Sequence, residues 1–465
     1  MGKTQQMLEQ EPIGKLLLKY SVPAIIGMMV NALYNVVDRM FIGNIPGVGP
    51  LAITGVGVTM PIVTIILAFS MLIGIGATTN ISIKLGQGKK EEAQELIGNS
   101  ISLSVVIGII LTIIGIVFGN SILKLFGASE GSLYYAKAYI NIILLGTVFN
   151  IMAFSLNSTI RGDGNPKLAA IIMVVGCLTN IVLDALLIFV FKMGIQGAAI
   201  ATVVSQIVTA LWGLLYYLKG KSNLEFKKSS LKLNKKHVKT IFAIGCSPFA
   251  MQIATSLVQV ISNNALKVYG GDLAIGAMAT IASIILIFLM PIFGITQGAQ
   301  PIVGFNYGCK QYDRAKKAFN ISLIAATIIL SLGTIAIQFF PEVLVSMFNK
   351  DPKLMDIAIN GLKKYSYMLP IVSVSIVGSN YVQSVGKAKT AMILSLLRQV
   401  ILLVPMIMVL PKFLGLDGVW IAQPVSDFIS FIITGMVIII EFKSYEKLVD
   451  CKEDDIEDSY EKYCG

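Results

Sequence analysis

Apolar runs of about 20 residues recur along the chain, and each is long enough to cross the hydrocarbon core of a bilayer as a helix. Short polar segments separate them. The runs predict about twelve spans, near residues 16–41, 51–76, 96–119, 135–158, 168–191, 197–218, 241–266, 273–298, 319–340, 363–384, 390–411 and 418–441. Their period is helical and lacks the ten-residue alternation of a membrane β-barrel, the other fold that satisfies its backbone in lipid. We therefore expect an all-α membrane protein.

The composition agrees with this pattern. Of 465 residues, 55% are hydrophobic and only 14% are charged, whereas a soluble domain carries about 25% charged residues. The net charge of +11 comes from basic residues at span ends and not from one patch with aromatics, so we expect no nucleic-acid partner. Neither a phosphate-binding P-loop nor a metalloprotease motif is present, and with one histidine a serine triad is not expected. We expect no enzymatic activity and no cofactor.

Basic residues also predict the topology. Lys and Arg concentrate in alternate connections, at 84–95, 159–167, 219–240, 306–317 and 385–389. Loops rich in Lys and Arg stay in the cytoplasm. The protein is therefore expected to cross the inner (plasma) membrane many times, with both termini in the cytoplasm.

The second half of the chain repeats the first at an offset of 222 residues. Leu51-Ala52-Ile53 falls on Leu273-Ala274-Ile275, and Gly164 falls on Gly386. Each half holds six spans, and an even number places both halves in the membrane in the same orientation. A pseudo-two-fold axis along the membrane normal should relate them, with a substrate cleft at their interface.

The repeat predicts the domain organisation. Residues 1–218 form an N-terminal six-helix lobe and residues 241–441 a C-terminal one. Residues 219–240 are a basic cytoplasmic linker, which we interpret as solvated, although such a segment could instead lie against anionic lipid. Residues 442–465 are a cytoplasmic tail.

Two carboxylates lie deep in the first half. Burying a charge in a membrane costs about 2.5 to 3.5 kcal/mol, so each carboxylate needs an interaction partner or a functional role. Asp38 and Asp184 share one depth, Asn180 lies one turn before Asp184, and Thr202 reaches the same level from the next span. Such oxygens suit a small cation, and without a cation one carboxylate would carry a proton. The alternative is a structural hydrogen-bond cluster.

A second deep pair lies in the other half. Arg398 and Asp427 both fall near mid-membrane on adjacent spans, which indicates an ion pair; alternatively, Asp427 faces the cleft and attracts cationic substrates. Asp38 maps onto Asn263, so a single ion site in the first half is expected. Pro23 interrupts the hydrogen bonds of span one and is a candidate hinge between Asp38 and the cleft.

Methionines are candidates for the wall of a promiscuous cavity, because flexible thioethers repack around varied shapes. The candidates are Met28, Met29, Met60, Met71 and Met290. The alternative is that they are ordinary core or lipid-facing positions.

Three motifs carry a family resemblance: LGQGKKEEA at 85–93, RGDGNPK at 161–167 and QGAQPIVGFNYG at 297–308. Together they resemble the multidrug and toxic compound extrusion family, MATE, and within it the prokaryotic branch of the DinF and MepA types. The resemblance implies a V-shaped pair of six-helix lobes. It also implies a sodium or proton site in the first lobe, formed by Asp38, Asn180, Asp184 and Thr202 with the backbone carbonyl of Ala198.

The resulting expectation is a monomeric secondary antiporter. It would export cationic or amphipathic small organic molecules in exchange for Na⁺ or H⁺ by alternating access, with membrane lipid as its other contact. The alternative is a flippase for lipid-linked saccharide precursors. A flippase would line its cleft with several basic residues to hold a pyrophosphate, and Arg398 is the only basic residue deep in a predicted span.

Overall fold

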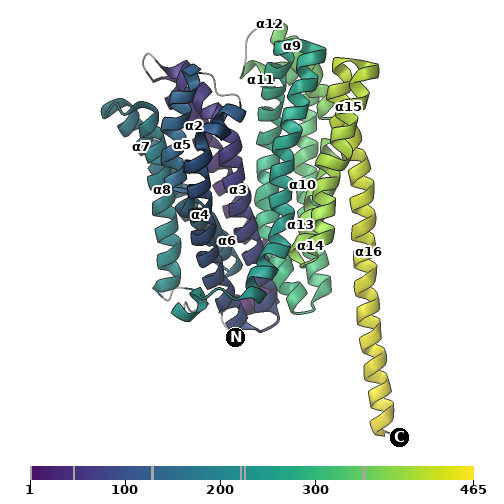
Figure 1. Cartoon of the computed structure of the whole chain (residues 1–465). Coiled ribbons are helices and arrows are strands. Elements are labelled where there is room, and N and C mark those ends of the chain that lie inside the picture. Colours follow the sequence, from purple (N-terminus) through teal and green to yellow (C-terminus); the bar gives the residue numbers. More distant parts are fainter. Residues whose placement is uncertain are drawn as a thin grey trace.

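The computed structural model describes residues 3–45, 48–126, 130–219, 222–224, 227–348 and 352–464, and these residues are almost entirely helical. Two groups of upright helices stand side by side (Figure 1). The all-α expectation is therefore confirmed, and the two groups correspond to the two halves of the sequence.

The short helix α1 (Lys3–Gln10) precedes the first lobe. That lobe contains α2 (Ile13–Gly43), α3 (Gly49–Gly86), α4 (Lys90–Leu125), α5 (Glu130–Leu145), α6 (Thr147–Gly162), α7 (Pro166–Ala185) with the π-helical turn η1 (Leu186–Val190), and α8 (Gly194–Leu218). The linker holds the 3₁₀ turn η2 (Lys228–Leu231).

The second lobe begins with α9 (Lys235–Gly308), which comprises two spans joined at Gly271. Gly271 has φ 67° and ψ −167°, a conformation open to glycine and strained for other residues. The lobe continues with α10 (Tyr312–Phe339), α11 (Pro341–Ser346), α12 (Pro352–Tyr365), α13 (Leu369–Ser384), α14 (Ala388–Leu396), the π-helical η3 (Leu397–Leu402), α15 (Leu403–Leu414) and α16 (Leu416–Cys464).

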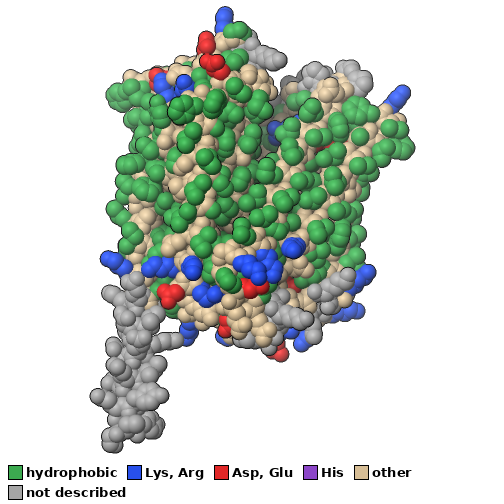
Figure 2. All heavy atoms as spheres, turned by 180° about the vertical axis from the view of Figure 1, so that it is seen from behind, with side chains coloured by type: hydrophobic (Ala, Val, Ile, Leu, Met, Phe, Trp, Pro, Cys, Tyr) green, Lys and Arg blue, Asp and Glu red, His purple; other side chains and the backbone are tan. Residues whose placement is uncertain are grey.

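The fold comprises twelve transmembrane segments, six in each lobe. Within the described ranges, ten helical segments and one bent pair are long and apolar enough to cross a membrane, and the shorter helix α13 covers most of the span expected at 363–384. Exposed hydrophobic side chains cover the outer surface between the two ends, and Lys and Arg gather near the end that carries the termini (Figure 2).

Two spans differ from the straight helices that hydropathy predicts. The span expected at 135–158 bends by 55° where α5 meets α6, next to Gly146. The span expected at 363–384 is interrupted between α12 and α13, and Pro370 lies in the first turn of the new helix, where its missing N–H leaves no hydrogen bond unmade.

Helices α3 and α9 pack backbone to backbone near the end that carries the termini. A Cβ atom on Gly245 of α9 would overlap the carbonyl oxygen of Leu72 in α3, and one on Gly86 of α3 would overlap the carbonyl oxygen of Phe305 in α9. Only glycine permits backbones to pack this closely. The interface is therefore shut at this end.

Helix α2 begins against the second lobe and ends within the first. Near its start, Arg314 of α10 donates to the carbonyl of Glu11 at 2.8 Å, and Ser21 donates to the carbonyl of Ile295 at 3.5 Å. Contacts with α9 continue past Pro23 to Ile25 and Met28. Toward its end α2 packs within the first lobe, where the ring of Phe41 lies 5.7 Å from that of Phe189 in η1.

Helix α9 makes the reciprocal crossing. Its first turns are attached to the first lobe, where Asn80 of α3 donates to the carbonyl of Thr240 at 3.1 Å. At Ser247 it also contacts the second lobe, since Ser247 and Ser395 share a hydrogen bond of 3.3 Å. Pro248 lies in this region, where contacts to both lobes overlap, as Pro23 does in α2.

The interlobe linker is fixed to the first lobe at two places. At its start, the buried Asp163 accepts hydrogen bonds from Tyr216 at 2.5 Å, from Ser222 at 2.9 Å and from the backbone of Asn223 at 3.2 Å. Burial of this carboxyl raises its pKa to about 6. The described part of the linker is therefore bonded to the α6–α7 turn.

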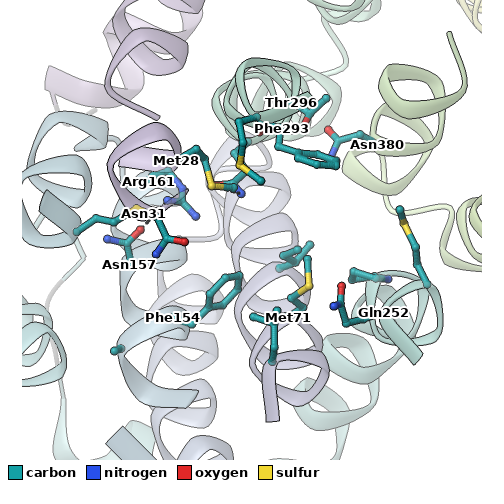
Figure 3. Close-up of a pocket in the computed structure, with 18 of the residues that line it drawn as sticks. Met28, Asn31, Met71, Phe154, Asn157, Arg161, Gln252, Phe293, Thr296 and Asn380 are labelled. Carbon is teal, nitrogen blue, oxygen red and sulfur yellow. Dashed lines mark hydrogen bonds between the residues drawn. The ribbon is translucent and has the colours of Figure 1, made fainter. Parts of the chain in front are cut away.

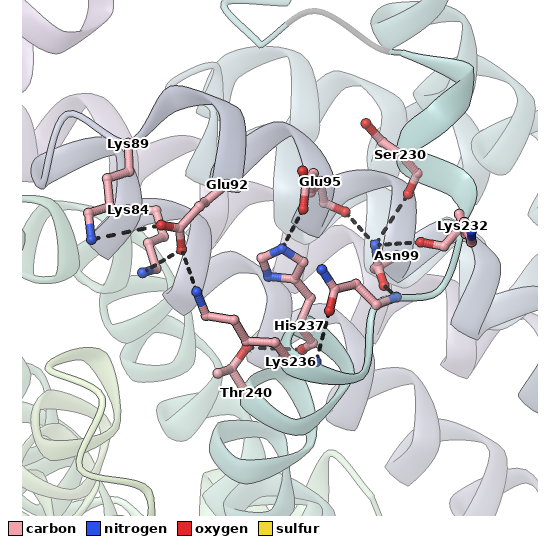
Figure 4. Close-up of polar contacts among 11 residues, drawn as sticks. Lys84, Lys89, Glu92, Glu95, Asn99, Ser230, Lys232, Lys236, His237 and Thr240 are labelled. Atoms are coloured by element: carbon pink, nitrogen blue, oxygen red, sulfur yellow. Dashed lines mark hydrogen bonds and ion pairs between the residues drawn. The ribbon is translucent and has the colours of Figure 1, made fainter.

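The second attachment joins the end of the linker to α4 (Figure 4). The Asn99 side chain donates to the carbonyl of Ser230 at 3.2 Å and accepts from the backbone N–H of Asn234 at 2.8 Å. His237 and Glu95 are 2.7 Å apart. The start of α9 is thus held on α4, which differs from the expectation of a solvated linker.

Candidate functional site

A cavity of about 580 Å³ lies between the lobes. Its wall is formed by α2, α3, α6, α7 and α8 on one side and by α9, α13, α14 and η3 on the other. Figure 3 shows side chains from both lobes pointing into this space. In the space-filling view the molecule is hollowed between the lobes at the end opposite the termini (Figure 2).

Much of the cavity wall is flexible and apolar. Met28, Met71 and Met290 line the cavity, as the sequence indicates, but Met29 and Met60 do not. Met29 is exposed on the outer face of α2. Further apolar lining comes from Met173, Met251, Phe154 and Phe293. Such a wall can repack around ligands of different shape.

Polar lining comes mainly from neutral amides, including Asn31, Asn157, Gln252 and Asn380. The charged side chains in the wall are Arg161 and Arg398, and among the described residues no Asp or Glu lines the cavity. The charged side chains of the described wall are therefore both basic, and one of them, Arg398, is paired with Asp427 outside the wall.

Beside the cavity the structure brings together four of the polar residues singled out in the first half. The carboxyl groups of Asp38 on α2 and Asp184 on α7 lie next to each other. When the oxygen and nitrogen of the Asn180 amide are exchanged, both form good hydrogen bonds. The nitrogen then donates to Asp184 at 3.0 Å, and the oxygen accepts from the backbone N–H of Thr202 on α8 at 3.3 Å. Ala198 is fully buried one turn before Thr202.

This cluster contains unsatisfied oxygens. The Oδ1 atoms of Asp38 and Asp184 are both buried and have no hydrogen-bond partner in the described part of the chain. A buried carboxylate oxygen without a donor is costly. A small cation or a proton at this point would satisfy it, and the set of carboxylate, amide and hydroxyl oxygens is the set that Na⁺ accepts.

The carboxyl groups are separated from the cavity by a thin layer of side chains. Asn180 and Tyr34 line the cavity, whereas Asp38, Asp184 and Thr202 lie behind them. Tyr34 sits one helical turn before Asp38. Asn180 therefore contacts the carboxyl cluster on one side and the cavity on the other.

Arg398 and Asp427 form an ion pair in the second lobe. The Arg398 Nε atom lies 2.6 Å from the Asp427 Oδ1 atom, which also accepts from Gln423 at 2.9 Å. Ser426 donates to the carbonyl of Arg398 at 2.7 Å. Arg398 lines the cavity and Asp427 does not, so the positive member of the pair faces the space between the lobes.

Three residues near the site escaped the sequence analysis. Tyr34 could have been found, because it precedes Asp38 by four residues and so shares its helix face. Tyr139 on α5 lies next to Thr202, and no spacing connects the two in sequence. Arg161 was set aside as a charge at a span end, but the cavity extends as far as this residue.

Comparison with known proteins identifies relatives over nearly the whole chain. The chain is 27% identical over 429 residues to the multidrug export protein MepA of Staphylococcus haemolyticus (strain JCSC1435), covering 91% of this chain and 94% of the relative. It is 26% identical over 411 residues to multidrug export protein MepA of Staphylococcus aureus (strain MRSA252), covering 88% and 90% respectively.

Solved structures share the fold. One is described as "Reverse polarity of binding pocket suggests different function of a MOP superfamily transporter from Pyrococcus furiosus Vc1 (DSM3638)", with a TM-score of 0.90 and 24% identity over 96% of this chain and 99% of that one. Another, "Outward-facing conformation of a multidrug resistance MATE family transporter of the MOP superfamily", has a TM-score of 0.90 and 23% identity over the same shares.

The family model described as MatE matches two segments of this chain, residues 23–186 and 248–409. Each segment lies in one lobe, so the match follows the internal duplication. Because the two segments together span most of the sequence, this chain belongs to the MatE family.

Proposed function

We propose that this protein is a secondary antiporter that exports amphipathic small organic molecules in exchange for Na⁺ or H⁺. The proposal rests on one observation above all. Two carboxyl groups from different helices, Asp38 and Asp184, meet inside the first lobe, each with a buried oxygen that has no partner among the described residues. A site of this kind exchanges a cation or proton and is otherwise costly to keep in a membrane.

The chemistry of the cluster supports either coupling ion. A proton shared by Asp38 and Asp184 would relieve the repulsion of two adjacent carboxylates. Alternatively, Na⁺ would be held by Asp38, Asp184, Asn180 and Thr202, with the carbonyl of Ala198 as a further oxygen. The ion itself supplies no reaction chemistry, and its role is to change which arrangement of the helices is stable.

The neighbouring cavity supports export of varied organic molecules. A wall of methionines and aromatic rings can accommodate different shapes, and proteins with similar sequences are named multidrug export proteins. Asn180 connects the two sites, because it lines the cavity and also bonds to Asp184. A change at the carboxyl groups would therefore reach the cavity wall directly.

Alternating access would follow from movement of one lobe against the other. The lobes meet through backbone contacts at the end that carries the termini, and the cavity is hollowed toward the opposite end. With the basic end in the cytoplasm, this structure corresponds to a state open to the outside.

The test is dye transport by protein reconstituted into lipid vesicles. Vesicles are loaded with ethidium, an amphipathic cation, or with carboxyfluorescein, an amphipathic anion, and an inward Na⁺ gradient or pH gradient is then imposed. We expect one of the gradients to accelerate release of at least one dye. Asp38→Asn and Asp184→Asn should each reduce this acceleration by a factor of about 100 or more, since each removes a titratable carboxylate.

Asp356→Asn is the matched control, because Asp356 is an exposed carboxylate on α12, and it should export like the wild type. Release that ignores both gradients for both dyes would overturn coupled antiport. Full gradient-driven export by both the Asp38 and Asp184 variants would show that coupling does not pass through these residues.

A further inference from the structure

The charged residues in the wall of the interlobe cavity are both positive. Arg161 comes from α6 of the first lobe and Arg398 from η3 of the second, and no described Asp or Glu shares the wall with them. A cavity with this lining favours a ligand of negative charge, because an enclosed wall of low dielectric strengthens the field of its charges.

Arg161 is buried without a described anionic partner. Its side chain is 8% exposed, and it donates to Asn157 at 2.6 Å and to Ser158 at 3.0 Å, both of them neutral. The nearby Asp163 is engaged by Tyr216 and the linker instead. A guanidinium has five N–H donors, so Arg161 retains donors for a ligand. A buried charge is stabilised by an ion that pairs with it.

Arg398 presents its guanidinium to the same space. Its Nε atom is bonded to Asp427, and in the described part of the chain no hydrogen bond is recorded for the two terminal nitrogens of the guanidinium. These nitrogens form a fork that suits a carboxylate, sulfonate or phosphate. Asp427 lies outside the cavity wall and balances the charge of Arg398, so Arg398 offers a ligand N–H donors, whereas Arg161 offers a charge without a described partner.

Gln383 adds a neutral donor at the position equivalent to Arg161. The internal repeat offset of 222 places Arg161 on Gln383, and both line the cavity. Gln383 is 6% exposed, and its Nε2 atom is buried and has no hydrogen-bond partner in the described residues. The two lobes thus offer unused N–H donors at matched positions.

From this arrangement we propose that the cavity binds amphipathic anions, with the anionic group held by Arg161 and Arg398 and the apolar part packed against the methionines and phenylalanines. The proposal rests on the proposed export function and specifies its substrate class. It differs from the expectation of cationic substrates, because a cation would meet two guanidinium groups and no carboxylate in the described part of the wall. A carboxylate, sulfonate or phosphate monoester on a hydrophobic body fits the site.

The test measures binding directly and does not depend on transport. The full-length protein is placed in nanodiscs of zwitterionic lipid, and fluorescence anisotropy reports binding of carboxyfluorescein and of ethidium, with empty nanodiscs subtracted. We expect the wild type to bind carboxyfluorescein at least about ten times more tightly than ethidium, the ratio that one charge-assisted hydrogen bond would produce.

Variants assign the effect to the arginines. Arg161→Gln should weaken carboxyfluorescein binding about ten-fold and Arg161→Lys should restore part of it. The double variant Arg398→Gln/Asp427→Asn removes the second charge without leaving Asp427 unpaired, and it should act similarly. Lys167→Gln removes a charge from an exposed site outside the cavity and is the matched control. If Arg161→Gln does not fold, the double variant and the wild-type dye preference still decide the question.

A competition experiment distinguishes two possible sources of the bound anionic group, a lipid headgroup and a soluble organic anion. Displacement of carboxyfluorescein by short-chain phosphatidic acid, and not by naphthalene sulfonate, would assign the site to a lipid headgroup; the reverse would assign it to a soluble organic anion. Tighter binding of ethidium than of carboxyfluorescein, or unchanged anion binding in both arginine variants, would overturn the proposal. Loss of gradient-driven export with the anion preference intact would overturn only the proposed antiport.

Discussion

Asp163 is a single buried carboxyl group whose protonation should affect stability. Its pKa is raised from 3.8 to about 6 by burial, so the folded protein takes up a proton at a higher pH than the unfolded chain does. At pH 7 the buried carboxylate is destabilising. As the pH falls below 6, Asp163 becomes protonated in the folded protein and the stability rises. The increase ends below pH 3.8, the pKa of this group in the unfolded chain.

The expected result is a difference in pH dependence between wild type and Asp163→Asn. Between pH 7 and pH 5 the free energy of unfolding of the wild type should rise by about 1 kcal/mol relative to the variant. Each pH unit between the folded and the unfolded pKa contributes about 1.4 kcal/mol. Thermal melting of the purified protein across this range, compared for the two proteins, measures it. Asp356→Asn, at an exposed site, should follow the wild type. Parallel curves for wild type and Asp163→Asn would contradict this account.

The sequence predicts the proximity of residues that lie on regular helices. Helical rise and the four-residue repeat were enough to place Asp38, Asn180 and Asp184 at one depth, and the structure has Asp184 in contact with both of the others. The position of Arg161 could not be read in this way. Its role depends on how far the cavity extends toward the end of α6, and hydropathy contains no information on that.

At the scale of elements, α2 and α9 determine how the lobes can move. Each begins against one lobe and continues in the other, and each has a proline in the region where contacts to both lobes overlap, Pro23 in α2 and Pro248 in α9. Proline removes one backbone hydrogen bond and makes bending easier there. Movement of the lobes must bend or shift these two helices, because their ends are attached to different lobes.

We expect Pro23→Ala to separate binding from transport. Restoring the missing hydrogen bond should stiffen α2 while leaving the cavity wall unchanged, because Pro23 does not line the cavity. Gradient-driven dye export should fall about ten-fold, whereas dye affinity in nanodiscs should stay within about two-fold of the wild type. Vesicle transport and fluorescence anisotropy on the same preparation measure the two quantities.

Pro61→Ala is the matched control, since Pro61 also lies inside a helix, α3, and outside the cavity wall. It should export at the wild-type rate. Equal export by wild type and Pro23→Ala would rule out a hinge at this position.

Sequence predicted which segments are helical and missed where they bend. Long apolar runs must be helical in lipid because every backbone group needs an internal partner. The 55° bend between α5 and α6 and the break before α13 depend instead on what each segment packs against. Helices also extend beyond the apolar runs. Helix α3 continues to Gly86, well beyond the expected end at 76, because a helix can continue outside the hydrocarbon core of the membrane.

For the whole molecule, the repeat at an offset of 222 predicted two lobes of six spans, and the fold confirms this. It could not predict the reciprocal crossing of α2 and α9 or the attachment of the linker to Asn99 on α4. Both arise from contacts between segments far apart in the chain. The side on which the cavity opens is likewise a property of one conformation and not of the repeat.

That conformation leads to a prediction about sidedness. The hollow between the lobes lies at the end opposite the termini (Figure 2), and basic loops mark the other end as cytoplasmic. In a background without native cysteines, a membrane-impermeant maleimide added to intact cells should therefore label Gln252→Cys, which lines the cavity. It should not label Lys89→Cys, which is exposed in the turn between α3 and α4. Both should react after the cells are opened. Labelling of Lys89→Cys alone in intact cells would mean the opposite orientation, and labelling of neither would mean that the cavity is closed to the outside in the resting membrane.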